Sequence, residues 1–433
     1  MIRLIRFSDA DFETHFRSIE QRAEEIPAGI EEAVSGIVAD VRARGDEALQ
    51  EYTLRFDRLD LRTFGMELTP TQIDAARTQV SADDLAALEL AAERIGAYHR
   101  RQKQETWICT DEDDIQLGQL VRPLDRVGIY VPGGKAAYPS SVLMNAIPAR
   151  VAGVKEIAMV VPMPDGEVNP HVIAAAHLAG VTRIFPLGGA QAVAALAYGT
   201  RSVPRVDKIT GPGNIYVATA KKMVFGQVDI DMIAGPSEIL IINDGSGNPA
   251  HLAADLLSQA EHDELASSVL VTTDEKMAQE VQSEVEQQLQ QLSRQGIARS
   301  SIDNYGAIIV AQQMEEAAEL CNRIATEHLE LAVDNPYELL PLIRHAGAIF
   351  MGHHTPEALG DYVAGPNHTL PTGGSARFFS PLSLDDFVKK SSLIYCSKAG
   401  LQRLGGAAVQ IAGLEGLDAH ARSVSLRLND DNV

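Results

Sequence analysis

The spacing of apolar residues along the N-terminal part of the chain predicts helices. One helical face, with positions at i, i+4, i+7, i+8 and i+11, is apolar and consists of Ile30, Val34, Ile37, Val38 and Val41. Ser81, followed three residues later by Asp84, resembles a capping box and predicts a helix that continues through residues 85–95. We therefore expect a helical N-terminal region.

From about residue 127 the pattern changes to short apolar runs that alternate with helical stretches, as is typical of buried parallel strands. A first series of strands is predicted at 127–131, 157–161, 181–185 and 208–210, with helices at 141–151, 171–179, 190–197 and 215–224. A second series is predicted at 238–242, 268–272, 307–310, 329–333 and 348–350, with helices at 252–262, 276–290 and 314–324. The pattern predicts two α/β units that join near residue 237.

The stretch from about residue 382 is predicted to be helical, without strands, and to end in a short helix at 416–427.

Composition and charge narrow the classes of partner. At about 150 residues per domain, the 433 residues predict two to three domains. Asp and Glu number 59 against 37 Lys and Arg, and a net charge of −22 repels phosphate backbones and anionic membranes. The longest charge-free stretch, 184–200, is interrupted by Pro186, Gly188 and Gly189, and is too broken for a membrane span. We expect neither nucleic acid nor a membrane as a partner.

The cysteines and the N-terminus indicate the compartment. The chain has three cysteines, an odd number, and they are widely spaced at Cys109, Cys321 and Cys396. We therefore expect neither a disulfide framework nor a CxxC zinc site. Free thiols fit a reducing compartment. The first residues reach Asp9 without the apolar core of a signal peptide. We expect a cytoplasmic protein.

Three glycine-rich turns follow predicted strands, at residues 132–135, 187–190 and 211–214. The last of them opens a helix but lacks the third glycine of GxGxxG, because Tyr216 stands there. Ligands of open α/β sheets bind at the carboxyl ends of strands, and helix N-termini there favour phosphate. The turns therefore indicate a phosphate-binding pocket, although tight turns between strand and helix explain them as well. A fourth turn, Gly-Pro-Ser-Glu, is built to present Ser237, or to cap a neighbouring element with it.

Candidate metal ligands lie on one predicted helix. Gln259 and His262 are spaced i, i+3 and share a face, so they can converge on one cation. Asp361 and His420 could complete the set, since imidazole and oxygen donors suit zinc. A structural role for a helical histidine is the alternative. The adjacent His353 and His354 form a rival metal pair, although neighbouring histidines in such a loop are usually exposed.

Glu327 and His328 precede a predicted strand and place a carboxylate beside an imidazole. Histidine titrates near neutral pH and suits a general base, and the carboxylate could activate water. A pair at the strand edge that faces solvent is the alternative.

Taken together, these stretches resemble the histidinol dehydrogenase family over nearly the whole chain. The most specific stretches are residues 126–134, 188–191, 208–214, 230–238, 257–262, 327–329, 360–362, 365–371 and 416–420. Several of them are long and far apart, which a chance match does not explain.

The resemblance implies a fold and a division of the chain. The fold is α/β, with two Rossmann-like, incomplete dinucleotide-fold domains built on parallel sheets and helical N- and C-terminal extensions. The implied boundaries are 1–24 for the N-terminal helical extension, 25–237 for the first α/β domain on the NAD side, 238–381 for the second α/β domain with the zinc and acid–base residues, and 382–433 for a C-terminal helical dimerisation segment.

The resemblance also implies a zinc-dependent, four-electron oxidation of L-histidinol to L-histidine. It proceeds through L-histidinaldehyde, reduces two NAD and is the final step of L-histidine biosynthesis. Glu327 and His328 take the acid–base roles, with His328 as the base for the hydroxyl proton and Glu327 as the group that activates water.

The other implied site residues follow from the same match. One zinc per subunit is bound by Gln259, His262, Asp361 and His420. NAD is contacted by Tyr130, Gln191 and Asn214. The substrate is contacted by Ser237, Gln259, His262, His328, Asp361, Glu415 and His420. The family forms an intertwined homodimer, so the segment with Glu415 and His420 is expected to complete the partner's site.

Other functions stay open at this point. A related zinc- and NAD-dependent dehydrogenase could act on another small alcohol, such as a sulfonated diol, although Glu415 suits an ammonium group better than a sulfonate. A metal- or nucleotide-binding protein without catalytic activity is a second alternative. The presence of Glu327 and His328 beside a full set of metal ligands makes this alternative less favourable. A structural protein has no supporting feature beyond the helical ends.

Overall fold

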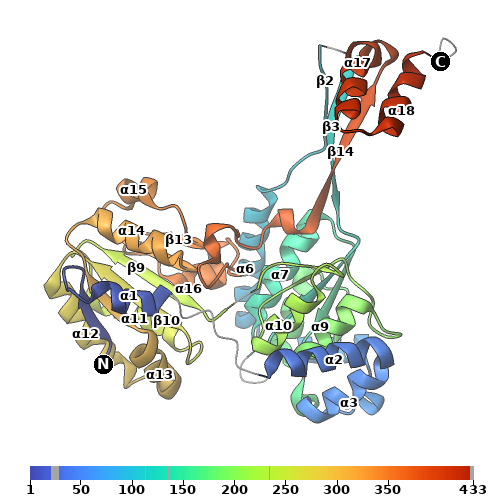
Figure 1. Ribbon diagram of the computed structural model, residues 1–433. Coiled ribbons are helices and arrows are strands. Elements are labelled where there is room, and N and C mark those ends of the chain that lie inside the picture. Colours follow the sequence, from blue (N-terminus) through green and yellow to red (C-terminus); the bar gives the residue numbers. More distant parts are fainter. Residues whose placement is uncertain (21–28, 113, 134–136, 234, 430–433) are drawn as a thin grey trace. The chain divides into compact units, whose positions relative to one another are not determined.

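The computed structural model describes residues 1–20, 29–112, 114–133, 137–233 and 235–429. Its contacts divide the chain into two units (Figure 1). The large unit comprises Met1–Gln102 and Leu124–Phe387, and the small unit comprises Lys103–Pro123 and Val388–Val433. Each unit is described by itself.

The first sheet of the large unit has five parallel strands in the order β6-β5-β4-β7-β8. Its strands are β4 (Arg126–Tyr130), β5 (Glu156–Val160), β6 (Arg183–Phe185), β7 (Lys208–Thr210) and β8 (Asp229–Ile230). The connecting helices are α7 (Pro139–Ala152), α8 (Pro170–Ala179), α9 (Gly189–Tyr198) and α10 (Ile215–Val224). Because the first strand in sequence, β4, lies in the middle, the chain builds outward in both directions, as in dinucleotide-binding folds.

N-terminal helices pack against this first sheet and share its apolar core. They are α2 (Ile30–Arg44), α3 (Asp46–Asp57), α4 (Leu61–Phe64), α5 (Pro70–Arg77) and α6 (Ala82–Arg100). The predicted apolar face of α2 is confirmed, since Ile30, Val34, Val38 and Val41 are buried in the core. Ser81 caps α6 as predicted, and its hydroxyl accepts the N–H of Asp84.

The second sheet has six parallel strands in the order β1-β11-β10-β9-β12-β13. Its strands are β1 (Arg3–Arg6), β9 (Glu238–Asn243), β10 (Ser267–Thr272), β11 (Ala307–Val310), β12 (His328–Ala332) and β13 (Ala348–Met351). Helices α11 (Pro249–Ala260), α12 (Glu275–Leu289) and α13 (Gln295–Tyr305) share the core on one face. Helices α1 (Phe12–Glu20), α14 (Met314–Ile324) and α15 (Pro336–Leu339) share the core on the other.

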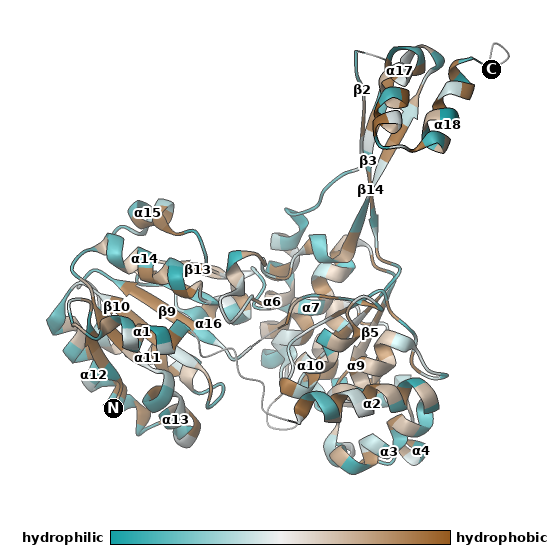
Figure 2. Cartoon of the chain, in the orientation of Figure 1, coloured by the Kyte–Doolittle hydropathy of each residue, from teal (hydrophilic) through white to brown (hydrophobic). Residues whose placement is uncertain are grey.

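The central strand β9 shows why the apolar pattern of the sequence predicts these strands clearly. Ile239 and Ile241 point into the core on one face of the sheet, whereas Leu240 and Ile242 point into the core on the other. A strand buried on both faces reads as a continuous apolar run, and β9 is coloured accordingly in Figure 2. The predicted parallel strands and the α/β fold class are confirmed.

The small unit corrects one prediction. It holds an antiparallel sheet, ordered β14-β3-β2, of β2 (Trp107–Thr110), β3 (Ile115–Pro123) and β14 (Val388–Cys396), followed by α17 (Lys398–Leu414) and α18 (Asp418–Leu428). The prediction that the stretch after residue 382 lacks strands is wrong, because β14 pairs along its length with β3. The polar residues from Lys389 to Ser392 interrupt the apolar pattern by which a strand is predicted from sequence. The strand that pairs with β14 is also distant in sequence.

The N-terminus departs from the helical expectation as well, since Arg3–Arg6 forms the edge strand β1 beside β11. The small unit combines residues 103–123 with the C-terminal segment 388–433, whereas the predicted division follows the chain in four successive segments. The four-part division stays a prediction. Every helix in the described part of the chain is too short or too polar to cross a bilayer.

Candidate functional site: an acid–base and cation cluster and a dinucleotide loop

The predicted acid–base residues lie at the amino-terminal edge of the six-stranded sheet. Glu238 is the first residue of β9 and His328 is the first residue of β12. The two strands are parallel neighbours, and His328 lies opposite Ile239 in the register. The start of one strand thus places the His328 ring beside the backbone of the next.

Hydrogen bonds fix the orientation of the His328 ring. Nδ1 lies 3.0 Å from the carbonyl oxygen of Glu238, which can only accept, so Nδ1 carries a proton. The side-chain nitrogen of Gln259 lies 3.4 Å from the same Nδ1, which already carries a proton and therefore accepts no hydrogen bond from it. Nε2 faces the other way, 3.5 Å from Oδ1 of Asp361. In the neutral ring, Nε2 is therefore the nitrogen that accepts a proton.

Carboxylates surround this ring and control its charge. Glu327 and Glu357 each place a carboxylate oxygen 3.6 Å from Nδ1 of His328. Burial alone lowers the pKa of His328, but the charges of Glu357, Glu327 and Asp361 outweigh burial and raise that pKa well above its usual range. Burial raises the pKa of Glu327 to about 8. One oxygen of Glu327 accepts the N–H of Glu238 at 2.9 Å.

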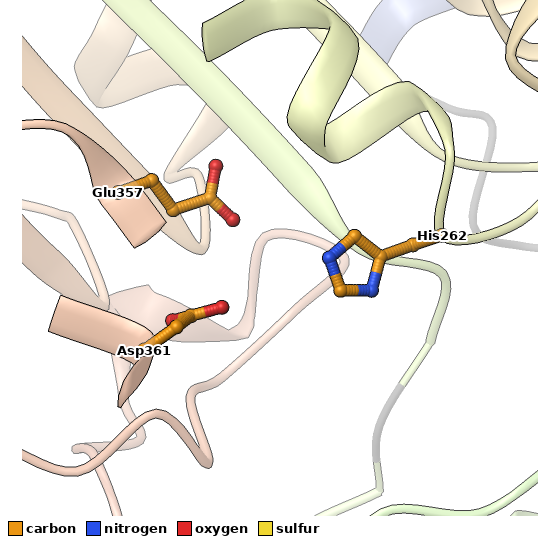
Figure 3. Close-up of side chains that lie close together, drawn as sticks. All are labelled: His262, Glu357 and Asp361. Carbon is orange, nitrogen blue, oxygen red and sulfur yellow. The ribbon is translucent and has the colours of Figure 1, made fainter. Parts of the chain in front are cut away.

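A group of possible metal ligands lies against the same ring. One ligand atom each of His262, Glu357 and Asp361 lies within 4.8 Å of the others (Figure 3). His262 follows the C-terminal end of α11, Glu357 begins α16 (Glu357–Leu359) and Asp361 lies in the helical turn η3 (Gly360–Ala364). Oε1 of Gln259, in the last turn of α11, is buried and has no hydrogen-bond partner among the described residues.

The structure thus brings three of the four predicted zinc ligands, Gln259, His262 and Asp361, around His328. The fourth, His420, lies in α18 of the small unit and is exposed. Sequence reasoning missed Glu357. A signal was present, since Glu357 precedes Asp361 by four residues, the spacing that places two side chains on one helical face.

Two further predicted substrate residues have different surroundings. Ser237 is half-buried directly before Glu238, and its carbonyl oxygen accepts the N–H of Ser267 at 3.0 Å. Glu415 caps the C-terminal end of α17 in the small unit and is exposed. Ser237 therefore lies next to Glu238 in the sheet that carries His328, whereas Glu415 lies in the small unit, as His420 does.

The rival histidine pair lies at the other edge of this sheet. His353 follows β13, and its Nε2 lies 3.3 Å from Oδ1 of Asp334 and 3.1 Å from Oγ of Ser246. In the described part of the chain, the group with metal-binding geometry is His262, Glu357 and Asp361, and it includes neither His353 nor His354.

The predicted dinucleotide residues lie at the carboxyl edge of the five-stranded sheet. Tyr130 ends β4, and its hydroxyl accepts the N–H of Gly189 at 3.0 Å at the start of α9. Gln191 is buried in the first turn of α9. Asn214 caps α10, and its Oδ1 accepts two backbone N–H groups at 3.1 and 3.2 Å. Burial raises the pKa of Tyr130 to about 12, so its hydroxyl stays neutral.

Comparisons with known proteins show the family of the chain. The family model for histidinol dehydrogenase matches residues 20–428. The chain is 69% identical over 430 residues to the histidinol dehydrogenase of Syntrophotalea carbinolica, covering 99% of this chain and 100% of that protein. It is 66% identical over 428 residues to that of Geobacter sulfurreducens, with 99% and 100% covered. A crystal structure of histidinol dehydrogenase from Elizabethkingia anophelis matches with a TM-score of 0.94 and 37% identity, covering 100% of this chain and 99% of that chain.

The two parallel sheets, one with a dinucleotide-type strand order and the other with a buried histidine among carboxylates, form an α/β fold, and the family match makes the chain an oxidoreductase. The chain belongs to the histidinol dehydrogenase family and is an NAD-dependent oxidoreductase.

Proposed function

We propose that the protein oxidises L-histidinol to L-histidine through L-histidinaldehyde, with reduction of two NAD, as the final step of L-histidine biosynthesis. Conversion of an alcohol to a carboxylate removes four electrons, and each NAD accepts two with one hydride. The observation that carries the proposal is the convergence of Gln259, His262 and Asp361 on the buried pair Glu327 and His328.

The first oxidation needs a base for the hydroxyl proton. The carbonyl of Glu238 keeps one proton of His328 on Nδ1. Because the pKa of His328 is raised, the ring must first release the second proton from Nε2, and Nε2 then accepts the hydroxyl proton of the substrate. Hydride then leaves the carbinol carbon for the nicotinamide. The product of this step is the aldehyde.

The second oxidation needs water. One oxygen of Glu327 is held by the N–H of Glu238, which leaves the carboxylate oriented to take a proton from water that adds to the aldehyde. A carboxyl group with a pKa of about 8 exchanges protons readily near neutral pH. After releasing its first proton, His328 accepts a hydroxyl proton of the hydrate, and the second hydride passes from the hydrate carbon to the second NAD, which leaves the carboxylic acid.

The residues present fit zinc. Gln259, His262 and Asp361 supply oxygen and imidazole donors that zinc accepts, and the buried Oε1 of Gln259 otherwise has no partner among the described residues. His420 from the C-terminal segment of a second copy would complete the set. Zinc bound there would orient the substrate through its imidazole and amino nitrogens.

The remaining contacts are proposed on the same basis. NAD contacts Tyr130, Gln191 and Asn214, where two helices begin. The substrate-binding residues are Ser237, Gln259, His262, His328, Asp361, Glu415 and His420, with Glu415 paired to the substrate ammonium.

A homodimer is proposed because Glu415 and His420 lie in the small unit, which exposes large apolar residues. These include Trp107, Ile108, Ile394, Tyr395, Ile411 and Leu414. Exposed apolar side chains of this size support an interaction site on the small unit. We place this dimer in the cytoplasm, with neither nucleic acid nor a membrane as a partner.

The test counts NADH formed per L-histidinol by the purified protein, stripped of metal and then supplied with zinc. Two NADH per substrate that appear only with zinc are expected. One NADH would mean that the reaction stops at the aldehyde and that the role of Glu327 is wrong. No NADH with zinc and NAD present would exclude this substrate, and other alcohols, including sulfonated diols, would then be screened.

A further inference from the structure

Lys221 and Asp231 form an ion pair in the interior of the large unit. Lys221 lies on α10 and Asp231 directly follows β8. Their side chains are 3% and 1% exposed, and Nζ of Lys221 contacts Oδ1 of Asp231. Removing two charges from water is costly even when they pair, so such a pair is weak support for a purely stabilising role. Its contacts indicate what else it does.

Both members of this pair hold one glycine. Oδ2 of Asp231 accepts the N–H of Gly211 at 2.7 Å, and Nζ of Lys221 donates to the carbonyl oxygen of Gly211 at 3.1 Å. Hydrogen bonds to charged groups are roughly twice as strong as neutral ones. The two backbone groups of Gly211 are therefore fixed from both sides by the same buried ion pair.

Gly211 is also held against the end of β4. It has a φ of +111°, and a Cβ atom there would lie 2.1 Å from the carbonyl oxygen of Tyr130. Only glycine fits that contact and that backbone conformation. The position of Gly211 and that of the Tyr130 backbone are thus linked by direct packing.

The loop that begins at Gly211 ends at Asn214, which caps α10 through two hydrogen bonds. Lys221 lies on the same helix, two turns further along. The loop is therefore held by the ion pair at its first residue and by the helix cap at its last. Tyr130 and Asn214, which adjoin these two points, are both proposed NAD contacts.

We propose that Lys221 and Asp231 are positioning residues that hold the loop 211–214 in the conformation that binds NAD. The inference rests on the proposed NAD contacts at Tyr130 and Asn214. Neither residue of the pair touches the reacting atoms. The pair acts through the backbone of Gly211, and its loss lets the loop leave the binding conformation before NAD arrives.

The test compares Lys221→Met with Lys208→Met. Lys208 begins β7 and is also a buried lysine, with its Nζ 2.9 Å from Asp386 and 3.0 Å from Asp229. It lies at the amino end of the strand that leads to the loop, so it tests the loss of a buried ion pair without contact to Gly211. Both variants are assayed as zinc-loaded full-length enzyme for KM of NAD, KM of L-histidinol, kcat and Tm.

We expect Lys221→Met to raise KM for NAD by about tenfold or more and KM for L-histidinol by less than about twofold. Lys208→Met is expected to lower Tm to a similar extent but to leave KM for NAD within about twofold of the parent. Equal changes of KM for NAD in both variants, or none in Lys221→Met, would overturn the inference.

A second variant keeps the test decisive if Lys221→Met does not fold. Asp231→Asn removes the charge but keeps an oxygen that can accept the N–H of Gly211, so a smaller rise in KM for NAD is expected. Titration of NAD into the folded variant, in the absence of L-histidinol, measures the same affinity directly. Unchanged NAD affinity in an active enzyme refutes the positioning role alone, whereas absence of NADH from the parent refutes the proposed function.

Discussion

The two parallel sheets of the large unit present their functional residues at opposite ends of their strands. In the five-stranded sheet, Tyr130 ends β4 and Asn214 follows β7, so the proposed dinucleotide residues lie at the carboxyl edge. In the six-stranded sheet, Glu238 and His328 begin β9 and β12, so the proposed acid–base residues lie at the amino edge. With these proposed sites, the first sheet follows the rule that ligands bind at the carboxyl ends of strands, and the second sheet departs from it.

Helix polarity gives a physical reason for this difference. Helices α9 and α10 begin at the carboxyl edge of the first sheet, and their N-termini carry partial positive charge that suits phosphates. Helix α11 ends at the amino edge of the second sheet, and Gln259 lies in its last turn. A helix C-terminus carries partial negative charge, which favours a cation. One edge therefore suits a dinucleotide and the other suits a metal ion and proton transfer.

The variant His328→Asn is the most severe test of the proposal that proton transfer takes place at the amino edge of the six-stranded sheet. The variant removes the nitrogen proposed to accept the hydroxyl proton, so kcat for both oxidations is expected to fall by about 10²–10⁴-fold. His353→Asn is the matched control, because His353 lies at the carboxyl edge of the same sheet beside Asp334. Steady-state NADH formation measures both variants. A comparable loss in the control would remove the distinction between the two edges.

Glu327→Gln separates the two oxidations. The amide keeps the size of the side chain but cannot take a proton from water, so turnover of supplied L-histidinaldehyde is expected to fall by about 10²-fold. Formation of the aldehyde from L-histidinol should fall less. Single-turnover measurements of each half-reaction give the ratio. Equal losses in the two half-reactions would contradict the assignment of water activation to Glu327.

Loss of a ligand tests the cation at the C-terminal end of α11. Gln259→Ala and His262→Ala are each expected to weaken zinc binding by about tenfold or more, because each removes one of few donors. Zinc retained after dialysis against a graded chelator measures the effect. His354→Ala, from the rival histidine pair, should retain the zinc content of the parent. Unchanged zinc content in both ligand variants would remove Gln259 and His262 from the ligand set.

The sequence predicted the parts of this molecule that depend on local pattern. Strand β9 is apolar at successive positions because both of its faces are buried, and its prediction is confirmed. Strand β14 escaped prediction because its residues Lys389–Ser392 are polar and its pairing comes from β3, far away in sequence. Local pattern cannot report a partner that only the fold supplies.

The same limit applies to the site. Glu327, His328, Gln259 and His262 stand in motifs that the sequence shows directly, whereas the orientation of His328 depends on the backbone of Glu238, on another strand. The contacts of Lys221 and Asp231 with Gly211 likewise have no motif, because each residue comes from a different element. Roles of this kind become visible only when the strands are placed side by side.

The smallest expected effect concerns a buried carboxyl on the dinucleotide side. Asp57 ends α3, and its Oδ2 is buried without a hydrogen-bond partner among the described residues. Burial raises its pKa to about 6. The folded protein therefore holds this proton more tightly than the unfolded chain does, whose aspartates titrate near 4. Stability from this group is present below about pH 4 and is lost as pH rises to about 6.

The variant Asp57→Asn cannot ionise at this position, so it does not lose stability as the pH rises. The variant is expected to melt about 2–4 °C higher than the parent at pH 8, with little difference at pH 4. Thermal melting across that range, with NADH formation as a second readout, measures the effect. If the variant instead melts lower at pH 8, or loses activity as Glu327→Gln does, then the Asp57 carboxylate has a function on the dinucleotide side. Buried carboxyls would then be functional at both sheets, and the amino edge would no longer be distinguished by them.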